Sequence, residues 1–208
     1  MSHYGAQCPT FHFHSPSPQC PHALVNLSPP MTFPQRILVL GSPGSGKSTL
    51  AKQISARLSL PIVHLDQVFW TSGWVQLSKV DFEARCVDLV SADSWVIDGN
   101  FSSTLHIRLP RATHVIFLDL PRVTCIRRAL SRIATHRGQT RPDMAPGCPE
   151  RFDFEFLRYI WTFPTRSRPR VLSELNSLRP DQTPLHFSSH PQSAAWLATL
   201  PKLLPSSP

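Results

Sequence analysis

A short glycine-rich segment combines residue types whose spacing suits phosphate chemistry. Residues 41–48 read GSPGSGKS and match the pattern G-x-x-x-x-G-K-[ST] in full. Glycines let the backbone turn so that successive amide groups point at phosphate oxygens. Lys47 can reach the β- and γ-phosphates of a nucleotide, and the Ser48 hydroxyl can ligate Mg²⁺. The segment predicts a nucleoside triphosphate site, formed by Gly41, Ser42, Pro43, Gly44, Ser45, Gly46, Lys47, Ser48 and Thr49.

Three aspartates follow apolar runs and are candidates to serve this site. Asp66, Asp98 and Asp119 each come directly after a strand-sized apolar stretch. A carboxylate at the end of a neighbouring strand commonly holds the Mg²⁺ of a nucleotide, although each aspartate could instead cap a helix or a turn. We favour Asp98, together with Ser48, for the metal, and Asp66 for the molecule that accepts the phosphate.

Arginine is unevenly distributed along the chain. Of the 17 arginines, 13 lie between residues 108 and 170, and the formal net charge is +8. Such clustering indicates an anionic partner, either the phosphates of a small ligand or a nucleic-acid backbone. Residues 137–151 are polar and rich in Gly, Pro and Arg, and we interpret them as a mobile lid that closes on the phosphates. The predicted catalytic residues are Lys47, Asp66, Asp98, Arg128, Arg132, Arg137 and Arg141.

Apolar runs alternate with helical periodicity from residue 36 onward. The strands are expected at residues 36–40, 61–65, 95–97, 114–118 and 184–187. The helices are expected at residues 47–58, 80–90, 123–134, 152–163, 171–178 and 192–200. Strands that alternate with helices predict an α/β fold with a doubly wound parallel sheet.

The two ends of the chain differ from this pattern. Residues 1–34 are rich in Pro, His and Ser with almost no charge, and we expect them and residues 201–208 to be disordered tails around one domain at 35–200. Five irregularly spaced cysteines predict reduced thiols. No apolar run approaches the ~20 residues of a membrane-spanning helix, and no secretory signal is recognisable, so the expected location is the cytoplasm.

Several motifs make the chain resemble a known family from residue 36 to its end. The motifs are residues 41–49, LDQVFW at 65–70 with Gly73-Trp74, WVIDGNFSS at 95–103, RLPRA at 108–112, VIFLDLP at 115–121, GCPERFD at 147–153 and YIW at 159–161. They resemble the adenylate-kinase-like P-loop proteins, above all small proteins named DNA topology modulation proteins. The resemblance implies a three-layer P-loop NTPase fold of nucleotide-kinase type, with a five-stranded parallel sheet and an arginine-rich lid at about 137–151.

The resemblance also implies roles for individual residues. Asp98-Gly99 matches an Asp-Gly pair that ends the third strand near Mg²⁺ in adenylate kinases. The aspartate that ends the second strand contacts the acceptor in related small-molecule kinases, which supports Asp66 as an orienting group or base. Adenylate kinases continue with Phe-Pro-Arg, whereas residues 100–102 of this chain are Asn-Phe-Ser. The usual acceptor arginine is therefore absent, and Arg108 or Arg111 is a candidate to replace it.

Three functions follow from these patterns. The leading hypothesis is an ATP- and Mg²⁺-dependent kinase for a small acceptor such as a nucleoside or nucleotide, with Trp70 and Trp74 as possible walls of the acceptor pocket. An alternative is a nucleic-acid-linked regulator that uses Arg166, Arg168 and Arg170, although the chain has no recognisable nucleic-acid-binding motif. The third is an ATP-hydrolysing switch. The sequence leaves the acceptor, DNA as a partner and the oligomeric state open.

Overall fold

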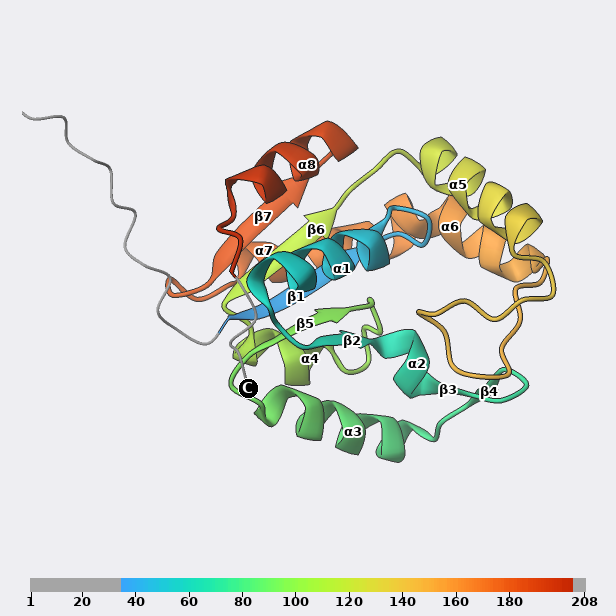
Figure 1. Ribbon diagram of the computed structural model, residues 1–208, viewed down its shortest axis with the longest axis horizontal. Coiled ribbons are helices and arrows are strands. Elements are labelled where there is room, and N and C mark those ends of the chain that lie inside the picture. Colours follow the sequence, from blue (N-terminus) through green and yellow to red (C-terminus); the bar gives the residue numbers. More distant parts are fainter. Residues whose placement is uncertain (1–34, 204–208) are drawn as a thin grey trace, which may run out of the picture. The chain divides into compact units, whose positions relative to one another are not determined.

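Five short strands form one parallel sheet in the computed structural model, which describes residues 35–203 (Figure 1). The strands are β1 (Arg36–Gly41), β2 (Ile62–His64), β5 (Trp95–Asp98), β6 (His114–Leu118) and β7 (Thr183–Phe187). They lie in the order β2-β5-β1-β6-β7, and every neighbouring pair is parallel. The expected tail at 1–34 and residues 204–208 of the expected tail at 201–208 lie outside the described residues. Residues 201–203 have no regular structure, and the Leu203 amide donates to the Arg57 carbonyl at 2.8 Å.

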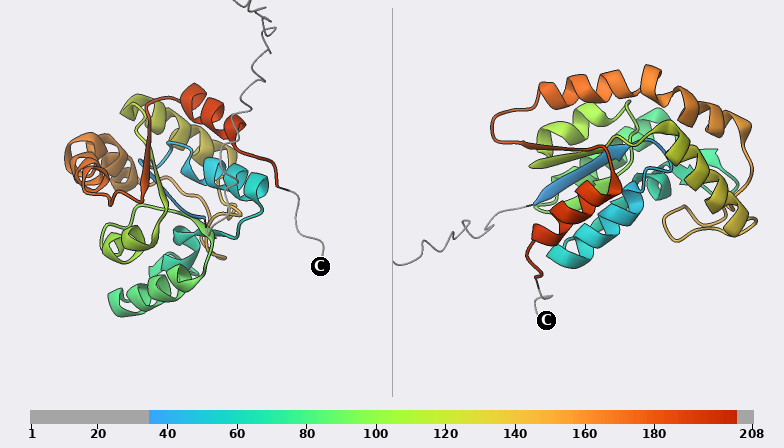
Figure 2. Two further views of the ribbon diagram at one scale, coloured as in Figure 1. Left: turned by 90° about the vertical axis from the view of Figure 1, so that its left-hand side faces the viewer. Right: turned by 90° about the horizontal axis from the view of Figure 1, so that it is seen from above.

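Helices cover both faces of this sheet and so create three layers. Alternate side chains of a strand point to opposite faces, and Leu38 and Leu40 of β1 accordingly face one cluster of buried residues while Ile37 and Val39 face the other. The first face is covered by α3 (Lys79–Ser91), α4 (Leu105–Arg108) and α7 (Arg168–Asn176). The second is covered by α1 (Lys47–Leu58), α5 (Arg122–Thr135) and α8 (His190–Thr199). Figure 2 shows α1 and α8 together on one side of the sheet.

The long helices end close to where the periodicity predicts. The α1 helix and strand β6 have the predicted bounds, and α5 is one residue longer at each end. The α6 helix (Phe154–Arg166) begins two residues later than expected because the Asp153 carboxylate caps it, accepting from the Phe156 amide at 3.1 Å. A side chain at this position satisfies an amide that has no partner inside the helix.

Short elements between residues 65 and 111 were not expected from the sequence. They are α2 (Leu65–Phe69), the hairpin of β3 (Trp70–Thr71) and β4 (Val75–Gln76), helix α4, and the 3₁₀-helix η1 (Leu109–Arg111). Elements of two to five residues do not generate a hydrophobic period. The predicted strand 61–65 was too long at its end, because Leu65 already starts α2. Asp66 therefore lies in a helix and not at the end of a strand.

The cysteines between residues 35 and 203 agree with the expectation of reduced thiols. Cys86, Cys125 and Cys148 are buried free thiols. Between residues 35 and 203, no helix has the length and the apolar character that a membrane crossing requires.

Candidate active site

The phosphate-binding loop connects the end of β1 to the start of α1. Gly44 and Gly46 have φ angles of 79° and 92°, in the left-handed region that favours glycine. A Cβ atom on Gly44 would lie 2.2 Å from the Cys125 carbonyl oxygen, so no other residue fits there. No side chain caps the first turn of α1, which leaves its amides available to an anion. The loop therefore has the shape and the open amides that a phosphate site needs.

Lys47, Ser48 and Asp98 meet at the end of this loop. The Lys47 ammonium donates to the Ser42 carbonyl at 3.0 Å, and the Ser48 hydroxyl donates to Asp98 Oδ2 at 2.6 Å. Strand β5 pairs with β1 and places Asp98 opposite Val39, so the parallel register brings the carboxylate to the loop. Burial lowers the pKa of Lys47, against the opposing effect of the Asp98 and Asp66 carboxylates. The lysine is thus a half-buried charge at the position where phosphates would bind.

A histidine that the sequence analysis did not single out completes the surroundings of Asp98. His64 Nδ1 lies 2.5 Å from Asp98 Oδ1, and both side chains are buried. His64 ends β2 and stands opposite Asp98 in the β2–β5 register. With one carboxylate oxygen held by His64, the second faces Ser48. The signal for His64 was its place at the end of a strand that neighbours β5, which only the sheet order reveals.

The donors at this point fit a magnesium ion. Mg²⁺ takes oxygen ligands and is usually bound through one or two protein groups together with substrate phosphates and water. The Ser48 hydroxyl and the Asp98 carboxylate are two such oxygens, and they lie in contact beside the phosphate loop. These residues would hold the metal of a bound nucleotide.

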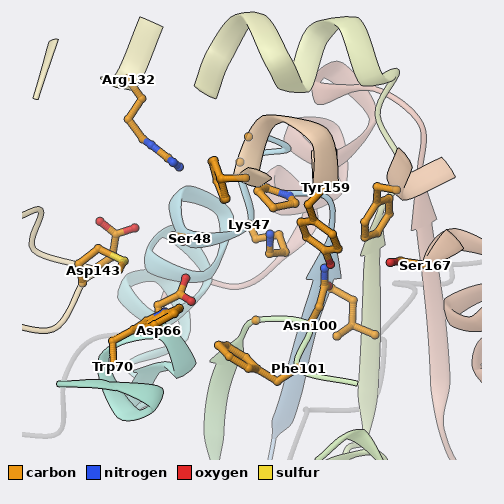
Figure 3. Close-up of a pocket in the computed structure, with 18 of the residues that line it drawn as sticks. Lys47, Ser48, Asp66, Trp70, Asn100, Phe101, Arg132, Asp143, Tyr159 and Ser167 are labelled. Carbon is orange, nitrogen blue, oxygen red and sulfur yellow. The ribbon is translucent and has the colours of Figure 1, made fainter. Parts of the chain in front are cut away.

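Asp66 lies on α2 and faces the same cavity. Burial raises the pKa of its carboxyl; the Lys47 charge opposes this effect, and the Asp98 charge adds to it. Figure 3 shows Asp66 on the same side of the cavity as Trp70 and Asp143. A half-buried carboxylate beside a lysine can orient a hydroxyl group or accept its proton.

Three of the four arginines predicted to be catalytic line the cavity. Arg128, Arg132 and Arg141 do so, whereas Arg137 is exposed and is not among the lining residues. Arg132 Nε and Arg141 Nε lie 3.0 and 2.5 Å from the same Glu150 oxygen, so the buried Glu150 carboxylate holds both guanidinium groups. Figure 3 shows Arg132 directed toward the space above Asp143 and Ser48.

Two of these arginines have further partners. Arg141 also pairs with Asp143 at 2.7 Å. Arg128 contacts His190 Nε2 at the start of α8, and both groups lie close to Gly46 of the phosphate loop. Arg128 therefore sits beside the predicted phosphate positions, while Arg141 is held by Asp143 and Glu150.

The predicted lid is fastened to the β3–β4 hairpin. The Gly73 amide donates to the Gly147 carbonyl at 2.9 Å, and Trp74 Nε1 donates to the Pro149 carbonyl at 3.2 Å. The Cys148 thiol also donates to a hairpin carbonyl, at 3.2 Å. The second half of residues 137–151, which we interpreted as a mobile lid, is thus in contact with residues about 75 positions away in sequence.

Apolar packing strengthens this attachment. Met144, Ala145 and Cys148 are buried and pack against Trp70 and Trp74. The two tryptophans therefore do more than wall a pocket: they form the surface onto which the lid folds. The sequence analysis missed both this packing and the role of Glu150, because neither has a local pattern.

Asn100 stands where adenylate kinases have phenylalanine, and it holds the phosphate loop. Its amide nitrogen donates to the Gly41 carbonyl at 2.7 Å, and its side-chain oxygen accepts from the Gly41 amide at 2.9 Å. The loop after β5 is thereby tied to the last residue of β1.

Neither arginine proposed to replace the missing acceptor arginine reaches the cavity. The Arg108 guanidinium is fully buried and donates to the carbonyls of Gly99, Asn100 and Phe101 at 2.5 to 3.0 Å. Arg111 Nε donates to a carbonyl of α3 at 3.2 Å. Both side chains support the backbone, because a guanidinium supplies five donors in a fixed geometry.

The third candidate aspartate is engaged elsewhere. Arg168 Nε lies 2.9 Å from both Asp119 oxygens, and His186 Nε2 lies 2.9 Å from one of them. Asp119 does not line the cavity that contains Lys47 and Asp66. Its position gives no reason to prefer it to Asp98 as the metal residue.

One cavity of about 760 Å³ is lined by several of the residues described above, namely Lys47, Ser48, Asp66, Arg128, Arg132 and Arg141. It runs from the phosphate loop past Asp66 and the lid to aromatic residues of α6 and to the start of α7. This volume lies in the upper half of the range that is typical of ligand pockets, about 300–1,000 Å³. The cavity has room for a nucleotide phosphate chain and a second small molecule.

Comparisons with known proteins find likeness only in the fold. No protein-family model and no curated protein matches the chain. Among solved structures, it is similar to shikimate kinase from Acinetobacter baumannii (15% identity over 79% of this chain and 89% of that one, TM-score 0.48). It is also similar to shikimate kinase from Bacteroides thetaiotaomicron (17% identity over 80% of this chain and 95% of that one, TM-score 0.46). A third similar structure is a gluconokinase from Sinorhizobium meliloti 1021 (18% identity over 81% of this chain and 94% of that one, TM-score 0.44).

The described part of the chain has the predicted fold class. It is a three-layer α/β structure of the P-loop, nucleotide-kinase type, with a five-stranded parallel sheet and a lid that carries arginine.

Proposed function

We propose that this protein is an ATP-dependent phosphotransferase that moves the γ-phosphate of ATP to a small acceptor. The observation that carries the proposal is the 2.6 Å contact between Ser48 and Asp98, beside the half-buried Lys47 and next to the cavity that Asp66 lines. A protein that only binds a nucleotide has no need for a second carboxylate in the cavity beside the phosphate loop.

Each group has a role in this proposal. The loop amides and Lys47 bind the triphosphate, and Ser48 and Asp98 hold Mg²⁺, which neutralises charge on the phosphate oxygens when bound. Arg128, Arg132 and Arg141 stabilise the negative charge of the transferring group. Asp66 orients the acceptor hydroxyl or takes its proton. Arg137 has no role here, since it lies outside the cavity.

The test is Mg-ATP turnover to ADP with and without a panel of nucleosides, nucleoside monophosphates and small hydroxylated metabolites. We expect one class of acceptor to stimulate ADP formation. Lys47→Ala should lower this turnover by about 10²-fold or more, because a charge that stabilises the transferring group is lost. Lys79→Ala, at an exposed lysine of α3, is the matched control and should turn over like the wild type.

Wild-type turnover in folded Lys47→Ala protein would contradict the proposed phosphate site. ATP hydrolysis that no acceptor stimulates would favour the ATPase switch. Salt-dependent DNA binding would favour the nucleic-acid-linked function, which the resemblance to DNA topology modulation proteins raises. Of the three arginines proposed for that function, Arg168 is paired with Asp119, and Arg166 and Arg170 line the cavity.

A further inference from the structure

We propose that the phosphate acceptor carries an oxyanion group, a carboxylate or a phosphate, which Arg166 and Arg170 bind at the end of the cavity away from Asp66. This inference rests on the proposed function and adds the chemical class of the substrate. It assigns to the α6–α7 junction a binding role that the phosphate-loop motif does not predict.

The two arginines are the cavity-facing members of a charged triplet at this junction. Arg168, between them, faces away and pairs with Asp119 at 2.8 Å. The side chain of Arg166, the last residue of α6, makes no hydrogen bond or ion pair with any other residue of the described range 35–203. Arg170 has only weak partners, the Ser102 carbonyl at 3.3 Å and Glu174 at 3.9 Å. Both guanidinium groups therefore keep donors available for a ligand.

Three of the four carboxylates that line the cavity have partners of their own. Asp143 and Glu150 pair with Arg141, and the Asp153 side chain caps α6. Asp66 faces Lys47. No acidic side chain lines the cavity beside Arg166 and Arg170, since Glu174 is outside the lining. An oxyanion is the ligand that a pair of such guanidinium groups binds most strongly.

The position of the junction suits a molecule that spans the cavity. Figure 3 shows Ser167, between the two arginines in sequence, on the opposite side of Lys47 from Asp66 and Trp70. Phe101, Tyr159 and Phe163 line the cavity toward this end. A hydroxyl group near Asp66 and an oxyanion at the arginines would leave the body of the acceptor against these aromatic rings.

The loop that carries Phe101 and Ser102 is held in a strained conformation. Phe101 has a φ angle of 32°, which non-glycine residues rarely adopt. Arg108 donates to its carbonyl at 3.0 Å, and this contact holds the loop in place. Such strain persists where the surrounding structure enforces it, commonly at ligand sites. Ser102, also in the lining, is thereby fixed beside Arg170.

The test uses inorganic phosphate as the probe, measured by isothermal titration calorimetry on the full chain. The protein is first saturated with Mg²⁺ and the non-hydrolysable nucleotide AMP-PNP, so that the phosphate loop is filled. We expect phosphate to bind at one remaining site. The double variant Arg166→Gln/Arg170→Gln should weaken this binding by about tenfold or more, since two charge-assisted contacts are lost.

A matched control separates this effect from net charge. Arg127→Gln/Arg158→Gln removes the same two charges from exposed positions outside the cavity lining, and it should bind phosphate like the wild type. A parallel titration with acetate identifies the preferred group, since tighter binding of acetate indicates a carboxylate and tighter binding of phosphate indicates a phosphate ester.

Failure of the two proposals can be told apart. If AMP-PNP does not bind, the proposed function fails, and the same phosphate titration on nucleotide-free Lys47→Ala protein still tests the arginine site. Phosphate binding that is equal in the wild type and in the Arg166→Gln/Arg170→Gln variant, or absent from both, would overturn the site. Displacement of bound phosphate by a short single-stranded DNA would also overturn it, because the arginines would then serve a nucleic acid.

Discussion

Asn100 and Arg108 show how two polar side chains fix the loop that follows β5 beside the phosphate loop. Asn100 exchanges two hydrogen bonds with the backbone of Gly41, and Arg108 donates to three consecutive carbonyls that follow Asp98. Loop carbonyls have no partners in regular secondary structure and must find donors when buried. Burial lowers the pKa of Arg108 to about 10, so the guanidinium keeps its charge at neutral pH.

Replacing Arg108 tests whether its hydrogen bonds stabilise the loop that follows β5. Arg108→Met keeps a long side chain but leaves the Gly99 and Asn100 carbonyls without their donor, and should lower the free energy of unfolding by about 2 kcal/mol or more. Urea denaturation measures the change. Arg111→Met is the control, since it removes one bond at an exposed position and should cost less than about 1 kcal/mol. Equal effects of the two substitutions would contradict a positioning role for Arg108.

At the scale of elements, the lid and the β3–β4 hairpin form one closed unit over the cavity. The lid residue Gly147 has a φ angle of 76° and lies against Ser72 of the hairpin. Opening the lid alone would break the Gly73–Gly147 hydrogen bond and expose the buried Met144 and Cys148. The contact between these two elements therefore links the Trp70 and Trp74 side of the cavity to Arg141 of the lid.

Gly147→Ala should disrupt this contact. The new Cβ would lie 2.2 Å from Ser72 Oγ and 3.2 Å from Ser72 Cα, so the lid must move away from the hairpin. We expect faster hydrogen exchange at the Gly73 amide and a lower kcat/KM. Gly138→Ala is the matched control, because Gly138 has a φ angle of 74° but no atom within 4 Å of the added Cβ. Both variants share the backbone strain of about 1–2 kcal/mol, and only Gly147→Ala adds the clash. Similar rates of hydrogen exchange at the Gly73 amide in Gly147→Ala and Gly138→Ala would contradict the proposed attachment of the lid to the hairpin.

At the scale of the whole described structure, Asp119 joins parts of the chain that are far apart in sequence. It follows β6 and pairs with His186 of β7 and Arg168 of α7. Burial alone would raise the pKa of Asp119, but the hydrogen bonds from Arg168 and His186 outweigh it and hold the pKa below its ordinary value of 3.8. A depressed pKa means that the ionised form stabilises the folded state.

This linkage predicts how stability depends on pH. The contribution of Asp119 is fully present above the unfolded-state pKa, near pH 4, and is lost as the pH falls through the lower folded-state pKa. Asp119→Asn should therefore be less stable than the wild type by about 1–2 kcal/mol at pH 7, and the difference should shrink toward pH 3. Urea denaturation across this range measures it. Asp93→Asn, at an exposed position, is the control, and its free energy of unfolding should vary with pH as in the wild type. If Asp119→Asn is less stable than the wild type by the same amount at every pH, the predicted role of Asp119 ionisation is wrong.

Local pattern was enough to predict the sheet, the long helices and the phosphate loop. Residues 41–48 carry glycines where the backbone needs left-handed conformations, and α1 shows its apolar period at Leu50, Ile54 and Leu58. The pairing of Ser48 with Asp98 was also expected, because parallel strands bring their carboxyl ends to one edge of the sheet. These features depend on residues that are close in sequence or on a general rule of topology.

The direction of individual side chains was decided by tertiary packing. Arg108 donates to backbone carbonyls and does not reach the cavity. Glu150 pairs with both Arg132 and Arg141. Trp74 donates to a carbonyl of the lid that is about 75 residues away in sequence. None of these contacts has a local signature. A long polar side chain can reach several partners, and the choice among them depends on which buried donors and acceptors the completed fold leaves without one.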